Sequence, residues 1–233
     1  ENKDTEKRIS VTPENVKKYI SNGFKVYLEK NYGQHLDIID EKFSENGAEF
    51  FSDKKKIIKE SNILLQLNLP NEEDLKNLSP KNNLIGVFDP VNNKDLISKI
   101  SANNINVFSL ELLPRITRAQ SMDILSSQAN LAGYKAVVDA FSYFNKAIPM
   151  MMTAAGTIPA AKVLVVGAGV AGLQAIATAK RMGAIVFATD VRMASKEQVE
   201  SLGGKFLVVE GSENLETSGG YAKETSDEFK KRQ

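Results

Sequence analysis

The stretch that decides the fold is KVLVVGAGVAGLQAIATAKRMGAIVFATD, residues 162–190. It reads as a buried strand, a glycine-rich turn, a helix and a second strand that ends on an acid. This order is typical of a βαβ unit, in which a helix connects two parallel strands. The stretch therefore predicts an α/β fold of Rossmann type for the second half of the chain.

Three glycines in this stretch match the pattern GxGxxG. Gly167 permits a tight turn, Gly169 lets the backbone approach a pyrophosphate, and Gly172 lets helix and strand pack closely. The helix is predicted to begin near Val170, where unpaired backbone N–H groups and the helix dipole favour negative charge. A lone GxGxxG can serve packing alone, but the strand before it and the helix after it favour dinucleotide binding.

The second strand of the stretch ends at Asp190, 18 residues after Gly172. This is close to the spacing of the acid that binds the adenosine ribose of a dinucleotide. A carboxylate there favours the free 2′-hydroxyl of NAD and repels the 2′-phosphate of NADP. Arg192 follows two positions later and leaves that preference open, and Asp190 has an ordinary alternative as a cap of the turn after the strand.

The amino-acid composition limits the classes of protein to which the chain can belong. The chain has 233 residues, 42% of them hydrophobic, so one or two domains with a buried core are expected. A formal charge of +1 without a basic block makes nucleic acid a poor partner. The absence of cysteine and the single His35 argue against a metal site. No apolar run reaches the roughly 18 to 20 residues that span a bilayer, so we expect this fragment to be soluble.

The first half of the chain alternates helices with short apolar strands. Thr12 can cap a first helix that has Pro13 at its first position and ends at Gly23. Strands are then predicted near 24–30, 63–67, 84–88 and 105–110. This alternation predicts a parallel sheet in an N-terminal α/β domain of residues 1–125.

The second domain is predicted over residues 126–233. It begins with a long, mostly apolar helix near 126–144 that links the two domains, followed by a segment at 153–159 that we expect to be flexible. After the opening stretch come a helix at 195–202 and a third strand at 205–209. We expect the chain to be incomplete at both ends, because the first half opens on a helix and the second stops after three strands.

Two segments carry a resemblance to a known family. RITRAQSMDILSSQANLAGYKAV, residues 115–137, and TAAGTIPAAKVLVVGAGVAGLQAI, residues 153–176, closely resemble the NAD(H)-binding domain I, in the alpha subunit, of proton-translocating NAD(P) transhydrogenases. The resemblance implies two Rossmann-like domains with NAD(H) in the cleft between them. It also implies direct hydride transfer to NADP(H) on a separate domain, coupled to proton movement through membrane helices.

The resemblance also implies site residues near the nicotinamide. A loop of the first domain would supply Arg115, Gln120, Asp123 and Ser126. The Gln120 amide can donate to and accept from the nicotinamide carboxamide, and the two charged residues can lock the loop. Without the resemblance, RAQSMD reads as a helix start with Ser121 as cap and Asp123 favouring the dipole.

Further partners follow from the same resemblance. Tyr221 matches a mobile loop that closes over the nucleotide, although a solvated linker is the competing interpretation. The apolar helix and the methionines at 150–152 favour a homodimer. The remaining partners would be an NADP(H)-binding domain and a transmembrane proton-channel domain, which places the chain at the peripheral face of a bacterial plasma membrane or a mitochondrial inner membrane.

Two other functions stay open. An alanine dehydrogenase shares this fold, but its family pattern uses a lysine and a histidine in the first domain to handle substrate. Here Gln66 stands near the lysine place, and His35 lies in a loop where an exposed polar role is expected. Hydride exchange between two nicotinamides needs no general base, which favours the transhydrogenase. A non-catalytic NAD-binding module is the third alternative.

Overall fold

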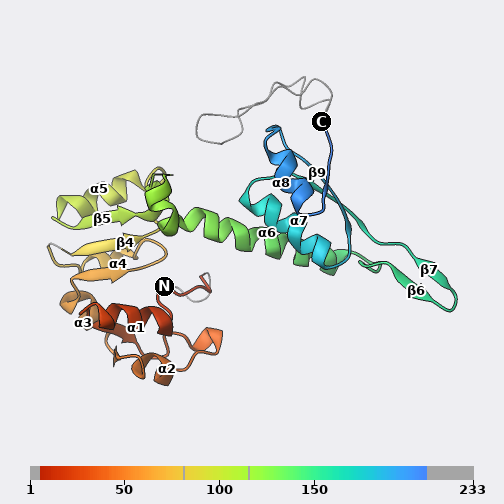
Figure 1. Ribbon diagram of the computed structural model, residues 1–233. Helices are drawn as coiled ribbons and strands as arrows, with labels where there is room; N and C mark the ends of the chain where they lie inside the picture. Colours follow the sequence, from red (N-terminus) through yellow and green to blue (C-terminus); the bar gives the residue numbers. More distant parts are fainter. Residues whose placement is uncertain (1–5, 81, 115, 209–233) are drawn as a thin grey trace. The chain divides into compact units, whose positions relative to one another are not determined.

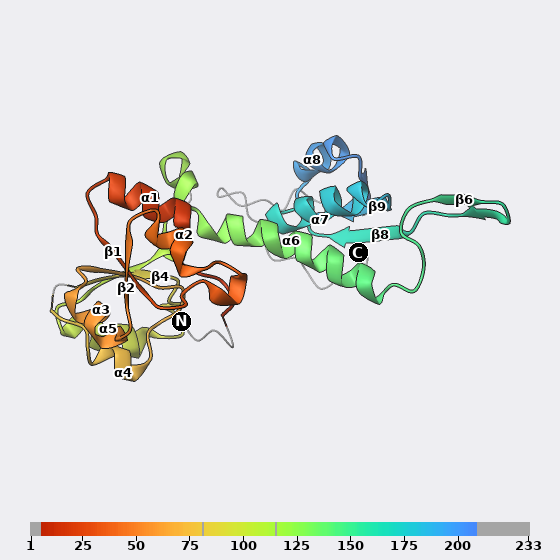
Figure 2. The same cartoon turned by 90° about the horizontal axis from the view of Figure 1, so that it is seen from below.

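The computed structural model describes residues 6–80, 82–114 and 116–208. The chain divides into two compact units, Glu1–Met122 and Asp123–Gln233. Both units are α/β and build their main sheets from parallel strands, as the ribbon shows from two directions (Figures 1 and 2). The predicted fold class is therefore confirmed. Arg115 and Tyr221 lie outside the described residues.

The first unit contains two parallel sheets. One is the pair β1 (Val26–Glu29) and β2 (Ala48–Phe51), and the other has the order β3 (Ile63–Leu65), β4 (Asn83–Gly86), β5 (Asn106–Ser109). The α-helices are α1 (Pro13–Ser21), α2 (Asp40–Ser44), α3 (Lys54–Glu60), α4 (Glu72–Leu75) and α5 (Lys94–Ala102), with 3-10 turns η1 (Gln34–Leu36), η2 (Leu110–Leu112) and η3 (Thr117–Met122). The sequence pattern missed β2, whose AEFF segment is too short to show a period.

The start of α1 follows the predicted chemistry. The Thr12 hydroxyl accepts a hydrogen bond from the Asn15 backbone N–H, and the Asn15 side chain accepts one from the Thr12 backbone N–H in return. Pro13 occupies the first turn, where its missing donor costs nothing. Gly23 follows the helix with a φ of +83°, a conformation that glycine adopts without strain.

Two apolar clusters hold the first unit together. One surrounds the fully buried Val16 and Phe43, and joins α1 and α2 to the β1–β2 pair. The other surrounds Leu84 and Phe88, and joins the three-stranded sheet to α5 through Ile100. Each sheet therefore buries one face against its own helices, which gives the first unit its stability.

The second unit is one half of a doubly wound fold. Its sheet has the order β10 (Lys205–Phe206), β9 (Ile185–Thr189), β8 (Lys162–Val166), with all strands parallel. Its helices are α6 (Ile124–Tyr143), α7 (Val170–Arg181) and α8 (Ser195–Ser201). This order of strands is that of a mononucleotide-binding half of a Rossmann sheet. The core beneath it is made of Ile176, Ala179, Val186, Ala188 and Val199, among others.

The segment expected to be flexible is instead an antiparallel hairpin. Strand β6 (Met151–Thr153) pairs with β7 (Gly156–Ile158), and the register places Met151 opposite Ile158. Gly156 has a φ of +129°, which allows the tight reversal. The sequence did not predict these two strands, because a short exposed hairpin buries too little apolar surface to leave a pattern in the sequence.

Helices α6 and α7 pack with their backbones unusually close. A Cβ atom added to Gly133 in α6 would lie 2.0 Å from the carbonyl oxygen of Ala171 in α7. Gly133 is itself buried. The absence of a side chain at this position therefore sets the distance between the linking helix and the first turn of α7.

Gly133→Ala tests this contact, because an open site and a closely packed one predict opposite changes in the free energy of unfolding. In the interior of an exposed helix, glycine to alanine stabilises by about 1 kcal/mol. Here the added methyl group meets backbone, so we expect a loss of roughly 1 to 3 kcal/mol in the free energy of unfolding. Chemical denaturation followed by circular dichroism measures the difference, and a gain in stability would contradict the close packing of α6 on α7.

Candidate functional site

The glycine turn lies between β8 and α7, at the carboxyl end of the parallel sheet. Gly167 has a φ of +93°, which side chains rarely tolerate, and its N–H donates a 2.8 Å hydrogen bond to the Thr189 carbonyl at the end of β9. The turn is thus tied to both β8, which it follows, and β9. Ligands of open α/β sheets bind at this edge, outside the carboxyl ends of the strands.

The other two glycines of the motif serve different purposes. A Cβ atom on Gly172 would lie 1.8 Å from the Gly167 carbonyl oxygen, so this position allows the helix to pack on the turn. A Cβ atom on Gly169 would meet only the Arg192 Nη2 atom, at 4.0 Å. Gly169 also precedes α7 without a side-chain cap, which leaves an open surface at the helix N-terminus around Val170.

Asp190 connects the end of β9 to the glycine turn. Its Oδ2 atom accepts a 2.6 Å hydrogen bond from the backbone N–H of Ala168, the residue between the first two glycines. Its Oδ1 atom accepts one of 2.8 Å from the backbone N–H of Arg192. The ordinary alternative drawn from the sequence, a cap of the turn after the strand, is therefore present in the structure. The ribose-binding role stays a prediction.

The Arg192 side chain also binds the Asp190 carboxylate. Its Nε atom donates to Oδ1 and its Nη2 atom donates to Oδ2, each over 2.9 Å. The Asp190 side chain is only 5% exposed and that of Arg192 18%. Burial alone would raise the pKa of Asp190, but the hydrogen bonds from Arg192 and Ala168 outweigh it and lower the pKa below its ordinary value. The carboxylate is thus ionised at neutral pH.

At the start of α6, Asp123 acts as the helix cap. Its Oδ1 atom accepts a 2.9 Å hydrogen bond from the Ser126 backbone N–H, and its Oδ2 atom accepts one of 2.7 Å from the Ser126 hydroxyl. Ser121, the cap proposed from the sequence, lies within η3 instead. The structure therefore brings Asp123 and Ser126 together, and it places Gln120 on η3 with its side chain exposed.

His35, Glu6 and Gln66 of the first unit each take part in hydrogen bonds within the protein. His35 is half-buried rather than exposed, and its Nε2 atom lies 2.9 Å from the Lys7 carbonyl oxygen. Glu6 is an acid that the sequence did not single out. Hydrogen bonds from the Arg8 side chain lower the pKa of Glu6 to about 2, against the opposing effect of burial. Gln66 follows β3, and its backbone N–H donates to the Ile85 carbonyl oxygen.

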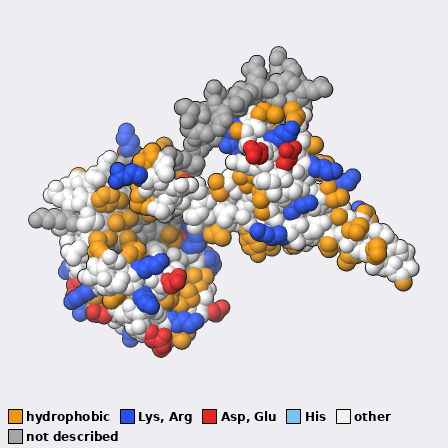
Figure 3. Space-filling view, in the orientation of Figure 1, with side chains coloured by type: hydrophobic (Ala, Val, Ile, Leu, Met, Phe, Trp, Pro, Cys, Tyr) orange, Lys and Arg blue, Asp and Glu red, His pale blue; other side chains and the backbone are white. Residues whose placement is uncertain are grey.

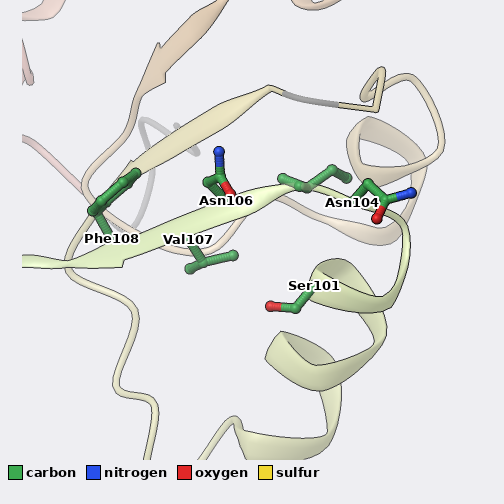
Figure 4. Close-up of a pocket in the computed structure, with 6 residues that line it drawn as sticks. Ser101, Asn104, Asn106, Val107 and Phe108 are labelled. Carbon is green, nitrogen blue, oxygen red and sulfur yellow. The ribbon is translucent and has the colours of Figure 1, made fainter.

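A shallow pocket lies between the end of α5 and the edge strand β5 (Figure 4). It is lined by Ser101, Asn104, Ile105, Asn106, Val107 and Phe108. No predicted site residue lines it, and no charged side chain is among its lining residues. This pocket therefore does not compete with the glycine turn as the functional site.

Two classes of feature are absent from the part of the chain that the structure describes. Within residues 6–80, 82–114 and 116–208, no cluster of three or more potential acidic or histidine ligands is placed to hold a metal ion. Among the same residues, no helix combines the length and the apolar character that crossing a membrane requires.

Two family models match the chain. The model of the alanine dehydrogenase/PNT N-terminal domain matches residues 1–132, and that of the C-terminal domain matches residues 136–231. Together they cover nearly all of the sequence. Among solved structures, a transhydrogenase from Sinorhizobium meliloti aligns with a TM-score of 0.85 at 48% identity, over 90% of this chain and 62% of that one. An L-alanine dehydrogenase aligns with a TM-score of 0.75 at 18% identity, which shows the shared fold alone.

Two transhydrogenase alpha subunits are similar to this chain over nearly all of its length. The first part of the NAD(P) transhydrogenase subunit alpha of Rhodospirillum rubrum is 46% identical over 100% of this chain and 62% of its own length. NAD(P) transhydrogenase subunit alpha of Haemophilus influenzae is 40% identical over 98% of this chain and 44% of its own length. The chain thus spans less than two thirds of these relatives. It belongs to the alanine dehydrogenase/PNT family, and the resemblance to transhydrogenase alpha subunits deduced from its sequence is confirmed.

Proposed function

We propose that this chain is the NAD(H)-binding component of a proton-translocating transhydrogenase. In this proposal its NAD(H) exchanges a hydride directly with NADP(H) that is bound on a separate domain. The observation that carries the proposal is the preformed glycine turn, with the Asp190 carboxylate held against it by the N–H of Ala168. The 46% identity to a transhydrogenase alpha subunit supports the reaction assigned to that turn.

The second unit would hold the adenosine half of the nucleotide. The pyrophosphate would lie over the open surface at Gly169, where the N–H groups from Val170 onward and the helix dipole attract negative charge. Asp190 would accept hydrogen bonds from the adenosine ribose, which favours NAD(H) over NADP(H). Gly167 and Gly172 would maintain the turn. NADP(H) is accordingly assigned to a partner domain.

The segment around Gln120 would position the nicotinamide. The exposed amide of Gln120 has both the donor and the acceptor that a carboxamide requires. Asp123 and Ser126 would stabilise the loop through their mutual hydrogen bonds. Arg115 and Tyr221 keep the loop-locking and covering roles that the resemblance implies. Positioning suffices for hydride exchange between two nicotinamides, because neither ring has a hydroxyl or amine proton to remove.

Alanine dehydrogenase is the rival function, because the family models include it and its fold is the same. Such an enzyme must bind a substrate carboxylate and handle an imine. The uncharged Gln66 stands near the position where the family pattern has lysine, so it offers no cation to a carboxylate. A non-catalytic NAD-binding module remains the alternative if no partner domain can oxidise bound NADH.

We also propose that two copies of the chain associate. Exposed large apolar side chains lie along α6, namely Leu125, Leu131, Tyr134 and Tyr143, and around the β6–β7 hairpin, namely Met150, Met151, Met152 and Ile158. The hairpin extends away from the sheet of the second unit, and hydrophobic side chains gather along it (Figures 1 and 3). The partners beyond a second copy would be the NADP(H)-binding and transmembrane proton-channel domains, at the peripheral face of a membrane.

Sedimentation equilibrium of the full-length protein that carries this chain tests the dimer. We expect about twice the mass of one polypeptide, because an exposed apolar patch of this kind marks a subunit interface. Met152→Glu places a charge on the hairpin and should shift the equilibrium toward the monomer. A monomeric mass for the native protein at micromolar concentration would contradict the proposal.

The reaction is tested by hydride exchange in the full-length protein together with its NADP(H)-binding component. We expect NADH to reduce an NADP analogue with a distinct absorbance, and we expect no NAD reduction by alanine. Gln120→Leu should lower kcat by at least about tenfold and leave the affinity for NADH nearly unchanged, because binding is carried by the adenosine end. Alanine-dependent NADH production would contradict the transhydrogenase function and would support alanine dehydrogenase.

The glycines offer a matched pair of variants for nucleotide binding. Gly169→Ala has room for its methyl group in the unliganded turn, so the thermal midpoint should stay the same while NADH affinity falls at least about tenfold. Gly172→Ala forces its methyl group against the Gly167 carbonyl oxygen, so both stability and binding should fall. Unchanged NADH binding by Gly169→Ala would show that the pyrophosphate does not bind at this turn.

A further inference from the structure

The Asp190 carboxylate has its hydrogen-bonding positions filled by donors of the protein itself. Oδ1 accepts from the backbone N–H and from Nε of Arg192, and Oδ2 accepts from the Ala168 N–H and from Nη2 of Arg192. Two oxygens offer about four lone-pair positions in all. With 5% of this side chain exposed, a ribose hydroxyl has no open oxygen to approach.

Two of these four hydrogen bonds come from backbone N–H groups and two from the Arg192 side chain. The backbone donors at Ala168 and Arg192 are fixed by the glycine turn and by the end of β9. The Nε and Nη2 donors belong to a flexible side chain, and rotation about its bonds removes both of them together. The same Nη2 atom lies 4.0 Å from the position of a Cβ on Gly169, next to the surface assigned to the pyrophosphate.

We propose that Arg192 is a latch that determines nucleotide specificity. In the structure its guanidinium occupies the edge of Asp190 that a ribose must reach, and in this proposal NAD(H) binds when this side chain rotates away. The proposal rests on the function proposed above, in which Asp190 receives the adenosine ribose. In this proposal Arg192 competes with the nucleotide for the Asp190 carboxylate and does not strengthen nucleotide binding.

The latch makes the affinity for a nucleotide depend on whether its adenosine ribose carries a 2′-hydroxyl or a 2′-phosphate. When only a fraction of the protein is competent to bind a ligand, the apparent association constant is the intrinsic constant multiplied by that fraction. The 2′- and 3′-hydroxyls of NAD(H) are donors and can replace Nε and Nη2 on the carboxylate. A 2′-phosphate brings no such donor at neutral pH, and its charge repels Asp190 once the guanidinium has left. Opening the latch therefore favours NAD(H), which brings two hydroxyl donors and no phosphate charge, over NADP(H), which brings one hydroxyl donor and a repelled phosphate.

The experiment compares Arg192→Gln with the native full-length protein by equilibrium titration with NADH and with NADPH, followed by nicotinamide fluorescence. We expect NADH to bind on the order of fivefold tighter to the variant, because two charge-assisted hydrogen bonds no longer compete. NADPH should bind no tighter. Arg181→Gln, an arginine exposed on the last turn of α7, is the matched control and should leave both affinities unchanged.

An NADH affinity of Arg192→Gln that is equal to or weaker than that of the native protein would overturn the latch. Equal tightening for NADH and NADPH would overturn it too, because the effect would then not involve the ribose. If Arg192→Gln fails to fold, Arg192→Lys replaces it, since lysine cannot span both oxygens and should also tighten NADH. If the native protein binds no NADH at all, the proposed function fails as well, which distinguishes the two failures.

A direct readout of the latch is the exchange of the Arg192 Nε–H with water, measured by NMR on arginine-labelled protein. The signal is assigned by its loss in Arg192→Gln. We expect slow exchange in the ligand-free protein and faster exchange after NADH is added, because the Nε–H leaves a buried acceptor. Protection that persists in the NADH complex would show that the side chain does not move, and would overturn the proposal.

Discussion

The hydrogen bond from the Ala168 N–H to the Asp190 carboxylate is the interaction on which the rest of the site depends. It joins residues 22 positions apart and fixes the glycine turn against the end of β9 over 2.6 Å. The carboxylate that accepts this bond is nearly buried, and in the structure the Arg192 guanidinium pairs with its charge. The turn is therefore held in this shape by hydrogen bonds within the protein.

Glycine is required around this bond for steric reasons that differ from one position to the next. Gly172 lets α7 lie on the turn, and Gly133 lets α6 lie on α7, each with a backbone oxygen where a Cβ would be. Gly169 instead leaves a surface open. The linking helix, α7 and the glycine turn thus belong to one closely packed unit.

Much of this unit could be predicted from the sequence, because local patterns specify it. The run VLVV, the glycine spacing and Asp190 predict strand, turn, helix and strand at nearly their observed bounds, and Thr12 and Pro13 predict the start of α1. The β2 strand and the β6–β7 hairpin were missed because they are too short to show a period. The occupation of Asp190 by Arg192 could not be predicted either, since spacing alone does not say which donor a carboxylate accepts from.

In the proposed function, the glycine turn and Asp190 hold NAD(H) and reject NADP(H). The most direct measurement is the equilibrium binding of NADH and NADPH by the native full-length protein, with the NADP(H)-binding component absent. We predict saturable binding of NADH and an affinity for NADPH that is weaker by at least about two orders of magnitude, equivalent to roughly 3 kcal/mol. Equal or tighter binding of NADPH would contradict the claim.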